Sequence, residues 1–355
     1  MTTPDAPART SQELVERIFS ASVAAMDIFG IYLGERLGLY RALTNGPLST
    51  EALATTAGID PRYAREWLEQ QAASGLVDFA GGAFSLPPAY AAVLADRDSA
   101  DYFAPIARML VAAAGQLPSL VSAFRTGGGI GWDAYGHDMI EGQSELNRPF
   151  FLHQLGTDVF PRIPPVHERL SRPGASVAEI GFGGGWASIA IARAYPGARV
   201  DGFDPDAHSV RIARENAEGA GVSDRATFHQ MDGAEAAASG RTYDLVCAFE
   251  CLHDMANPVA VLASMRELAG SNGVVLVMDE RVPDEFTGPG DEVERFMYGW
   301  SVTTCLPNGL AESPSAATGT VLRLPILETY AREAGFEAVD VLDIENDFFR
   351  FYILR

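Results

Sequence analysis

Short apolar runs and helical stretches alternate in the second half of the chain. This alternation is typical of an open, mostly parallel sheet with helices on its faces. The apolar runs predict five strands, near 177–180, 199–203, 226–230, 243–249 and 273–279. The closing stretch FEAVDVLDIENDFFRFYILR predicts two more strands that pair antiparallel. We therefore expect an α/β fold, a Rossmann-like, mostly parallel seven-stranded sheet with an antiparallel C-terminal strand.

The first half has helical spacing and begins with an unusually apolar helix. The stretch SASVAAMDIFGIYLGERLGLYRAL carries apolar residues almost all round, which indicates a helix buried against more than one surface. A two-fold partner would supply the second surface, so we expect a homodimer that associates through the N-terminal domain. Residues 1–10 are polar, and we expect a disordered tail there.

The next residues have the order of a winged helix. Ser49 or Thr50 caps a short helix that Gly58 ends, and Asp60 begins a second helix with Pro61 in its first turn. GLVDFAGGAFSL then has the pattern of a small hairpin. We expect four regions: a tail over 1–10, a winged-helix and dimerisation domain over 11–100, a helical linker with substrate-side helices over 101–170, and an α/β domain over 171–355 with a cap insertion at about 283–324.

The charge of the chain argues against a nucleic-acid partner. The formal net charge is -21, which repels polyphosphate. The second helix of the winged helix offers Arg62 and Arg65, but Asp60, Glu66 and Glu69 accompany them and no basic stripe follows. We expect neither nucleic acid nor a membrane to be a partner, since the chain also has no apolar run of membrane-spanning length.

The cysteine and lysine content limits which kinds of site and reaction the chain can have. The three cysteines, Cys247, Cys251 and Cys305, are too few for a disulfide framework and predict packing thiols in a cytoplasmic protein. Cys247, Cys251 and His253 have a spacing that suggests a metal, but three ligands straddling a strand end rarely converge, so we expect none. The chain contains no lysine, which excludes Schiff-base chemistry and a Walker lysine.

The stretch VAEIGFGGGWASIAIARAYPGARVDGFD, residues 177–204, predicts a cofactor site. A glycine-rich turn between a strand and a helix, followed by a second strand that ends in Asp, is how nucleotide-like cofactors are held. A dinucleotide fingerprint requires a third glycine after Gly181 and Gly183, and Trp186 stands at that position. A dinucleotide is therefore the less favoured cofactor.

The same loop resembles another family. Glu179, Gly181, Gly183 and Gly185 resemble the E/D-x-G-x-G-x-G motif of class I S-adenosylmethionine-dependent methyltransferases. The resemblance implies that S-adenosyl-L-methionine is the cofactor and S-adenosyl-L-homocysteine the product. The cofactor-binding residues that it implies are Glu179, Gly181, Phe182, Gly183, Gly185, Asp204, Pro205, Met231, Asp232, Gly233, Phe249 and Glu250.

Individual roles follow from these positions. Gly181 and Gly183 would let the backbone approach the amino-acid part of the cofactor, and Asp204 would accept hydrogen bonds from the ribose hydroxyls. Asp232 would bind the adenine amino group with Met231 covering the base, whereas the alternative for Asp232 is a turn residue before Gly233. Asp206, beside Asp204, is interpreted as a helix cap.

His253 follows the fourth strand in FECLHDMANP and is the candidate general base. The LHD tripeptide resembles a region of small-molecule O-methyltransferases with a winged-helix dimerisation domain, in which the histidine of an H-D-W sequence is the base. Here Met255 replaces the Trp. The resemblance implies that Asp279, at the end of the fifth strand, orients His253; the alternative is that His253 only caps a helix or packs against the sheet.

Further stretches resemble the same class along almost the whole chain. YLGERLGLYRAL, NRPFFLHQLG, DERVPDEFTGPGDEVERFMYGWSVTTCLPNGLAESPSAATGT and ENDFFRFY look like a large group of bacterial class I methyltransferases with an N-terminal winged helix. Many relatives have Cys where this chain has Phe182.

A substrate site is predicted under the long cap. Aromatic side chains are a usual lining for an apolar ligand, and plain packing is the alternative for each of them. The candidate substrate residues are Trp132, Tyr135, Met139, Phe150, His153, Phe296, Tyr298 and Trp300. We predict methyl transfer to oxygen, nitrogen or carbon of a small, apolar or aromatic molecule. The alternatives are a cofactor-binding regulator or sensor that uses the winged helix, and a non-methylating enzyme on the same scaffold.

Overall fold

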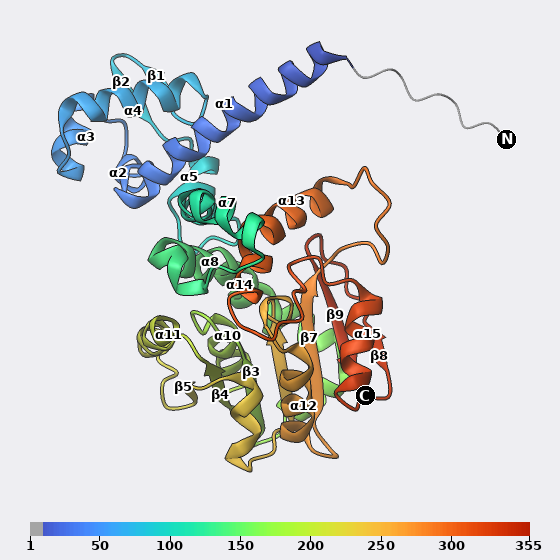
Figure 1. Ribbon diagram of the computed structural model, residues 1–355. Coiled ribbons are helices and arrows are strands. Elements are labelled where there is room, and N and C mark those ends of the chain that lie inside the picture. The colour runs from blue at the N-terminus through green and yellow to red at the C-terminus, as the bar shows by residue number, and fades with distance from the viewer. Residues whose placement is uncertain (1–9) are drawn as a thin grey trace. The chain divides into compact units, whose positions relative to one another are not determined.

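The computed structural model describes residues 10–355; residues 1–9 of the expected tail lie outside the described part. The chain divides into two compact units, residues 1–111 and 112–355, each described here by itself (Figure 1). The helices from residue 112 onward therefore group with the C-terminal unit.

The first unit has the predicted winged-helix order. Its elements are α1 (Ser11–Arg36), α2 (Leu39–Leu43), α3 (Thr50–Ala57), α4 (Pro61–Ala73), β1 (Asp78–Ala80), β2 (Ala83–Ser85) and α5 (Pro88–Leu94). Ser49 caps α3 by accepting a hydrogen bond from the amide of Ala52, and Asp60 caps α4. Gly58 ends α3 in the left-handed region, and β1 pairs with β2 as an antiparallel hairpin.

Helix α1 is exposed along most of its length within the chain, which differs from the expected burial. Leu14, Val15, Ile18, Phe19 and Met26 each leave more than half of their side chain in solvent. The buried α1 residues are two glycines near its C-terminal end, where the absence of side chains allows close packing. The apolar face N-terminal to them therefore has no cover from its own unit.

The second unit contains the predicted sheet. Its strands are β3 (Ser176–Ile180), β4 (Arg199–Asp204), β5 (Ala226–Gln230), β6 (Leu245–Phe249), β7 (Val274–Glu280), β8 (Val339–Val341) and β9 (Phe349–Leu354). They lie in the order β5-β4-β3-β6-β7-β9-β8, with β9 antiparallel to both of its neighbours and the other pairs parallel. The α/β prediction and the antiparallel closing strands are confirmed.

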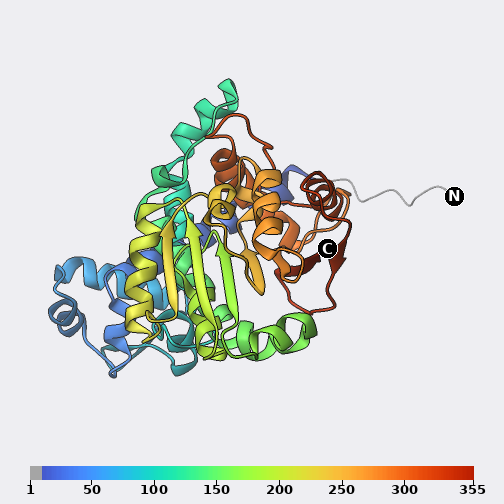
Figure 2. The same cartoon turned by 90° about the horizontal axis from the view of Figure 1, so that it is seen from below.

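Helices cover both faces of this sheet (Figure 2). The helices that follow α5 along the chain are α6 (Ile106–Gly115, which spans the division between the two units), α7 (Leu117–Thr126), η1 (Trp132–Tyr135), α8 (Gly136–Phe150), η2 (Phe151–Val159), η3 (Phe160–Arg162), α9 (Pro164–Leu170), α10 (Trp186–Ala194), α11 (Ala207–Gly219), η4 (Gly233–Ser239), η5 (Leu252–Asp254), α12 (Pro258–Ala269), α13 (Glu292–Trp300), η6 (Ser301–Cys305), α14 (Leu306–Gly309) and α15 (Leu324–Glu333).

Strand β7 shows how the sequence builds two cores. Its alternate residues Leu276 and Met278 enter one hydrophobic cluster, whereas Val275 and Val277 enter the cluster on the opposite face. A strand buried on both faces needs a continuous apolar run, which is the pattern of VVLVM in this stretch.

None of the described helices is by itself long and apolar enough to cross a membrane, and α6 with α7 reaches that length and composition only as a pair bent by 55°.

Candidate functional site

A cleft of about 800 Å³ lies where the parallel strands end, within the second unit. The chain leaves β3 to build β4 and β5 on one side and then returns to build β6 and β7 on the other. Open α/β sheets bind ligands at such a reversal, outside the carboxyl ends of the strands. The loop after β3, the ends of β4 and β6, helix α8 and residues 308–312 contribute to its walls.

The glycine loop after β3 forms the floor of the cleft. Gly181 and Gly183 have φ values of +69° and +51°, which side chains rarely adopt. A Cβ atom at Gly181 would lie 2.7 Å from Cys251 Sγ, whereas one at Gly183 would meet nothing within 4 Å. Gly183 therefore leaves open space for a ligand, and Gly181 allows the loop to pass close to the end of β6.

Gly185 was expected to bind cofactor, but the structure gives it a packing role. A Cβ atom there would lie 2.8 Å from the Phe228 ring, so this glycine allows the start of α10 to approach β5. Its neighbour Gly184 lines the cleft instead, and a Cβ atom on Gly184 would overlap the Ser144 hydroxyl of α8. The glycine pattern identified the loop, but it did not show that Gly184 lines the cleft and that Gly185 packs against β5.

Asp204 at the end of β4 holds this loop. Its Oδ2 accepts a hydrogen bond from the Gly183 amide at 2.9 Å, and its Oδ1 accepts one from the Asp206 amide at 2.9 Å. Burial raises the pKa of Asp204 to about 6, against the lowering effect of these hydrogen bonds. Asp206 caps α11 by accepting from the Ser209 amide, as expected, and it also lines the cleft.

Glu179, the first residue of the motif, is tied to α10. Its Oε2 accepts a hydrogen bond from the Ser188 hydroxyl, and the residue is almost fully buried. Burial raises the pKa of Glu179 to about 8, so the carboxyl group carries a proton at pH 7.

Asp232 lies at the cleft and is also a turn residue, as its alternative interpretation predicts. It lines the cleft, and its Oδ1 also accepts from the Ala234 amide to cap η4. Met231 packs against the core cluster on one face of the sheet and does not line the cleft. The expected contacts that do line it also include Phe182, Pro205, Gly233, Phe249 and Glu250.

His253 and Asp279 are brought together as expected. His253 lies on η5 just after β6, and its Nδ1 is 2.8 Å from Oδ1 of Asp279, the penultimate residue of β7. Burial lowers the pKa of His253, but the carboxylates of Asp279 and Asp254 outweigh it and hold that pKa well above the ordinary value. The imidazole is only 2% exposed, so the cleft reaches it through its neighbours Asp254 and Glu250.

Buried carboxylates surround this histidine. Asn147 of α8 donates to Glu250 Oε2 at 2.6 Å, while Glu250 Oε1 and Glu280 Oε2 have no hydrogen-bond partner among the residues that the structure describes. Burial raises the pKa of Glu250 to about 7 and that of Glu280 well above its ordinary value. Unpaired buried oxygens at the inner end of a cleft are positions that donors of a ligand would satisfy.

The thiols of Cys247 and Cys251 both donate to carbonyl groups of β3 rather than grouping with His253. Cys247 is fully buried, with its thiol directed at the Ala178 carbonyl, and Cys251 is directed at the Ile180 carbonyl. Asp254 and Cys305 group with His253 instead, with potential donor atoms within 4.8 Å of one another. Burial raises the pKa of Cys305 to about 12, so this thiol is protonated at neutral pH.

The cap reaches the cleft through other residues than expected. Between 283 and 324 the chain forms α13, η6 and α14, and Asn308, Ala311 and Glu312 line the cleft. The Ile130 amide donates to the Pro307 carbonyl at 2.8 Å, which attaches this part of the cap to the segment before η1. Within the segment predicted to be a cap, Asn308, Ala311 and Glu312 therefore line the cleft and the aromatic residues of α13 do not.

Most of the candidate substrate residues lie elsewhere in this structure. Trp132 lines the cleft. Tyr135 is buried with its hydroxyl donating to the Thr303 carbonyl at 2.8 Å, and Met139 is fully buried. Phe150 packs against Phe349 with ring centroids 5.2 Å apart.

The remaining three aromatics and His153 are directed to the surface or to one another. His153 is exposed, and Phe296 packs against Trp300 at 5.7 Å. The Tyr298 hydroxyl accepts from Arg323 at 3.1 Å. None of these four side chains lines the cleft, and α13 buries its Met297 side instead.

One face of α8 was missed. Ile140, Gln143, Ser144 and Asn147 line the cleft at helical spacing. Apart from Ile140 these residues are polar, and the stretch carries no motif. Only their spacing of three and four residues could have indicated that they share one face of the helix.

The comparisons agree with this geometry. Residues 177–273 match the family of methyltransferase domains, and residues 24–96 match the Rv2258c-like winged HTH domain. Residues 177–273 therefore have the sequence pattern of a methyltransferase domain. This match includes the glycine loop after β3, and the winged-helix match lies N-terminal to it.

Curated relatives of the methyltransferase domain differ in their acceptors. A ubiquinone biosynthesis O-methyltransferase from Azorhizobium caulinodans is 29% identical over 167 residues, 45% of this chain and 61% of the relative. A release factor glutamine methyltransferase from Rhodopirellula baltica is 34% identical over 91 residues, 25% of this chain and 31% of the relative. The chain thus spans less than two thirds of either.

Solved structures share the fold over nearly the full length. An O-methyltransferase family protein from Burkholderia thailandensis superposes with a TM-score of 0.72 at 18% identity, covering 98% of each chain. Human N-acetylserotonin methyltransferase, solved with S-adenosylmethionine, gives 0.68 at 15% identity and covers 99% of each chain.

The buried Glu179 makes stability depend on pH. A folded-state pKa of about 8, above the ordinary 4.5, means that the folded protein holds a proton that the unfolded chain has released between those values. Stability is therefore lost as pH rises from 4.5 to 8. We predict that Glu179→Gln, which cannot ionise, gains about 1.4 kcal/mol in free energy of unfolding relative to the native chain for each pH unit in this range.

Urea unfolding at pH 5, 6, 7 and 8 measures the difference. Glu218→Gln, at an exposed position of α11, is the matched control and should follow the native curve. Parallel curves for Glu179→Gln and the native chain would show that Glu179 is ionised in the folded protein.

Proposed function

We propose that this protein transfers a methyl group from S-adenosyl-L-methionine to a small molecule. The observation that carries the proposal is the acidic lining of the cleft at the strand ends, in which Glu179 is the member that is protonated at pH 7. Nine acidic residues line it, and among the described residues no arginine, lysine or histidine does so: Asp133, Glu179, Asp204, Asp206, Asp232, Glu235, Glu250, Asp254 and Glu312.

The acidic lining favours a cationic cofactor over one that carries phosphate groups. A dinucleotide brings two phosphate charges, which a cleft of carboxylates repels. S-adenosyl-L-methionine brings a sulfonium cation and two ribose hydroxyls that donate hydrogen bonds. The open space at Gly183 and the acceptor oxygens of Asp204 and Asp232 fit that molecule.

Individual residues of the chain would bind the parts of the cofactor and accept the proton. The cofactor supplies an electrophilic methyl group when bound. Asp204 would hold the ribose and Asp232 the adenine end, while the Gly181–Gly183 backbone would receive the amino-acid part. His253, oriented by Asp279, would accept the proton that the acceptor loses.

The inner end of the cleft also limits which chemical group can accept the methyl group. Glu250 Oε1 has no partner there, and Glu250 lines the cleft close to the histidine pair. An acceptor with an O–H or N–H group would satisfy this oxygen and would have a proton for His253 to remove. We propose oxygen or nitrogen, rather than carbon, as the methylated atom, on a molecule whose body contacts Trp132 and Ile140.

We also propose a homodimer formed through α1. The exposed residues Val15, Phe19 and Met26 fall on one side of this helix at 100° per residue, beside Leu14 and Ile18. A continuous exposed apolar stripe on a helix is typical of an interface between chains.

The cofactor assignment is tested by calorimetric titration with S-adenosyl-L-homocysteine. We expect saturable binding at one site and weaker binding by about 10- to 100-fold in Asp204→Ala, because each charge-assisted hydrogen bond contributes about 1.5–3 kcal/mol. Asp204→Asn, which keeps one acceptor oxygen, should fall between them.

Two comparisons make the titration decisive. Asp343→Asn, at an exposed position, should bind as the native chain does. Absence of binding to the homocysteine compound, or tighter binding of NADH, would refute the proposed cofactor.

The base is tested through the protonation of His253. Since Asp279 raises the pKa of His253, the neutral form needed for proton removal grows as pH rises, and methyl transfer should increase through pH 7 to 9. In Asp279→Asn the loss of the charge should shift both the titration of His253, followed by NMR, and the pH–rate profile to lower pH.

His253→Ala should lower kcat by about 10²- to 10⁴-fold and leave binding of S-adenosyl-L-homocysteine within about 2-fold. An unchanged profile in Asp279→Asn would show that the pair does not set the protonation of the base.

The dimer is tested by analytical ultracentrifugation at micromolar concentration. The native chain should sediment as a dimer, and Phe19→Glu with Met26→Glu should sediment as a monomer because two charges enter the apolar stripe. Ser20→Glu places the same charge on another side of α1 and should stay dimeric. A native monomer would disprove this interface.

A further inference from the structure

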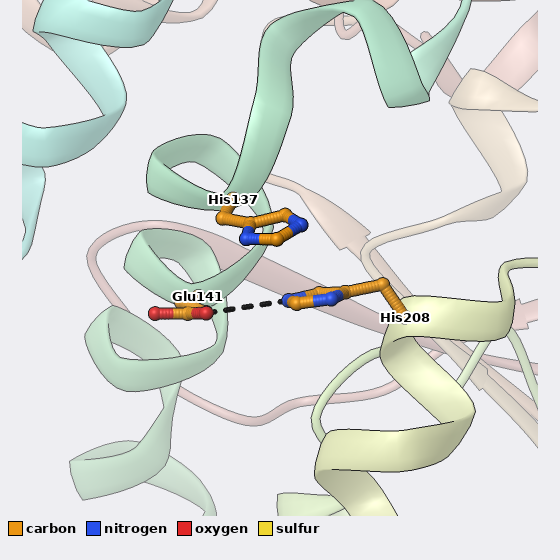
Figure 3. Close-up of side chains that lie close together, drawn as sticks. All are labelled: His137, Glu141 and His208. Carbon is orange, nitrogen blue, oxygen red and sulfur yellow. Dashed lines mark hydrogen bonds and ion pairs between the residues drawn. The ribbon is translucent and has the colours of Figure 1, made fainter.

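Three side chains that the proposed reaction does not use meet beside the cleft. His137 and Glu141 lie one turn apart on α8, and His208 lies at the start of α11 (Figure 3). One potential donor atom from each lies within 4.8 Å of the others. None of the three lines the cleft itself.

The set of donors is suited to a transition metal. Two imidazole nitrogens and one carboxylate oxygen are ligands that zinc and similar divalent ions bind, whereas magnesium and calcium prefer oxygen alone. A tetrahedral ion with ligands at about 2.0–2.2 Å separates them by about 3.4 Å. Donor atoms up to 4.8 Å apart would therefore have to approach by up to about 1.4 Å, and a fourth position would remain open to water.

The hydrogen bonds around His208 define which nitrogen is available. Arg211 is 3.1 Å from His208 Nδ1 and can only donate, so Nδ1 accepts and Nε2 carries the proton. Nε2 lies 3.3 Å from Glu141 Oε1. For a metal ion to bind at Nε2, the ring proton would move to Nδ1. The Arg211 guanidinium would then have to turn away from Nδ1, and it would keep its hydrogen bond to Glu215, which accepts from it at 2.9 Å.

The second histidine needs only a side-chain rotation. The rings of His137 and His208 are stacked, with centroids 3.9 Å apart and planes 16° apart. Lone pairs of imidazole lie in the ring plane, so parallel rings cannot bind one ion until one of them turns. His137 is exposed on α8 and has room to turn about its Cβ–Cγ bond.

Both helices contribute residues to the walls of the cleft. The same α8 supplies Ser144 and Asn147 to the lining, and Asp206 and Ser209 at the start of α11 line it too. We propose that His137, Glu141 and His208 bind a divalent transition metal ion of the zinc class, which fastens α8 to α11 and tightens cofactor binding between them. The ion site stands by itself, and the effect on cofactor binding rests on the function proposed above.

Calorimetric titration of the full chain with zinc chloride tests the site, with magnesium chloride as the comparison metal. The native chain should bind one zinc ion that His208→Gln and His137→Gln lose, while circular dichroism shows both variants folded. The control His153→Gln removes another exposed histidine and should bind as the native chain does. Equal zinc binding in native chain and His208→Gln, or none in the native chain, would overturn the site.

A second titration separates the site from its effect. S-adenosyl-L-homocysteine is titrated into native chain and His208→Gln, each with EDTA and with zinc. We expect at least about 3-fold tighter binding with zinc in the native chain and no change in the variant. Equal affinity with and without zinc in a chain that binds both would overturn the fastening, whereas loss of homocysteine-compound binding under every condition would refute the proposed function and leave the zinc site standing.

Discussion

The hydrogen bond from the Gly183 amide to the Asp204 carboxylate is the contact on which the site depends. It joins the loop after β3 to the end of β4, where a left-handed backbone at Gly181 and Gly183 would otherwise have many conformations. With the loop fixed, α10 starts at Gly185 and packs on β5, and the cleft has a defined floor. A single carboxylate thus links the glycine pattern to the shape of the ligand site.

Burial of acids sets the electrostatic character of the methyltransferase domain. Glu179 and Glu250 have raised pKa values because burial disfavours their charged forms, and for Glu250 this outweighs the lowering effect of its hydrogen bond with Asn147 and of His253. His253 has a raised pKa for the opposite reason, since carboxylates stabilise its charged form. A cationic donor and an acceptor that loses a proton are both favoured by such surroundings, whereas phosphate-bearing ligands are not.

The sequence predicted the strands and the helix caps because local pattern decides them. The apolar run around Val275 requires a strand buried on both faces, and Ser49 and Asp60 satisfy amides that lie next to them in the chain. The pairing of Asp279 with His253 came from the family resemblance rather than from local pattern, and the structure places their side chains within hydrogen-bond distance.

Contacts between distant segments were not predictable in this way. Asn147 reaches Glu250 across 103 residues, and nothing in the sequence around Asn147 signals that contact. The aromatic residues of the cap were assigned by type alone, and the packing of Phe296 on Trp300 depends on how α13 turns. Direction of a side chain is set by tertiary packing, which a single sequence shows only through periodicity.

The most direct measurement of the central claim is an experimental structure of the full chain with S-adenosyl-L-homocysteine. The account predicts the ribose hydroxyls at the Asp204 carboxylate, the adenine near Asp232 and the sulfur between the glycine loop and η5. A ligand bound outside this cleft, or a cleft that holds it with the ribose away from Asp204, would contradict the account.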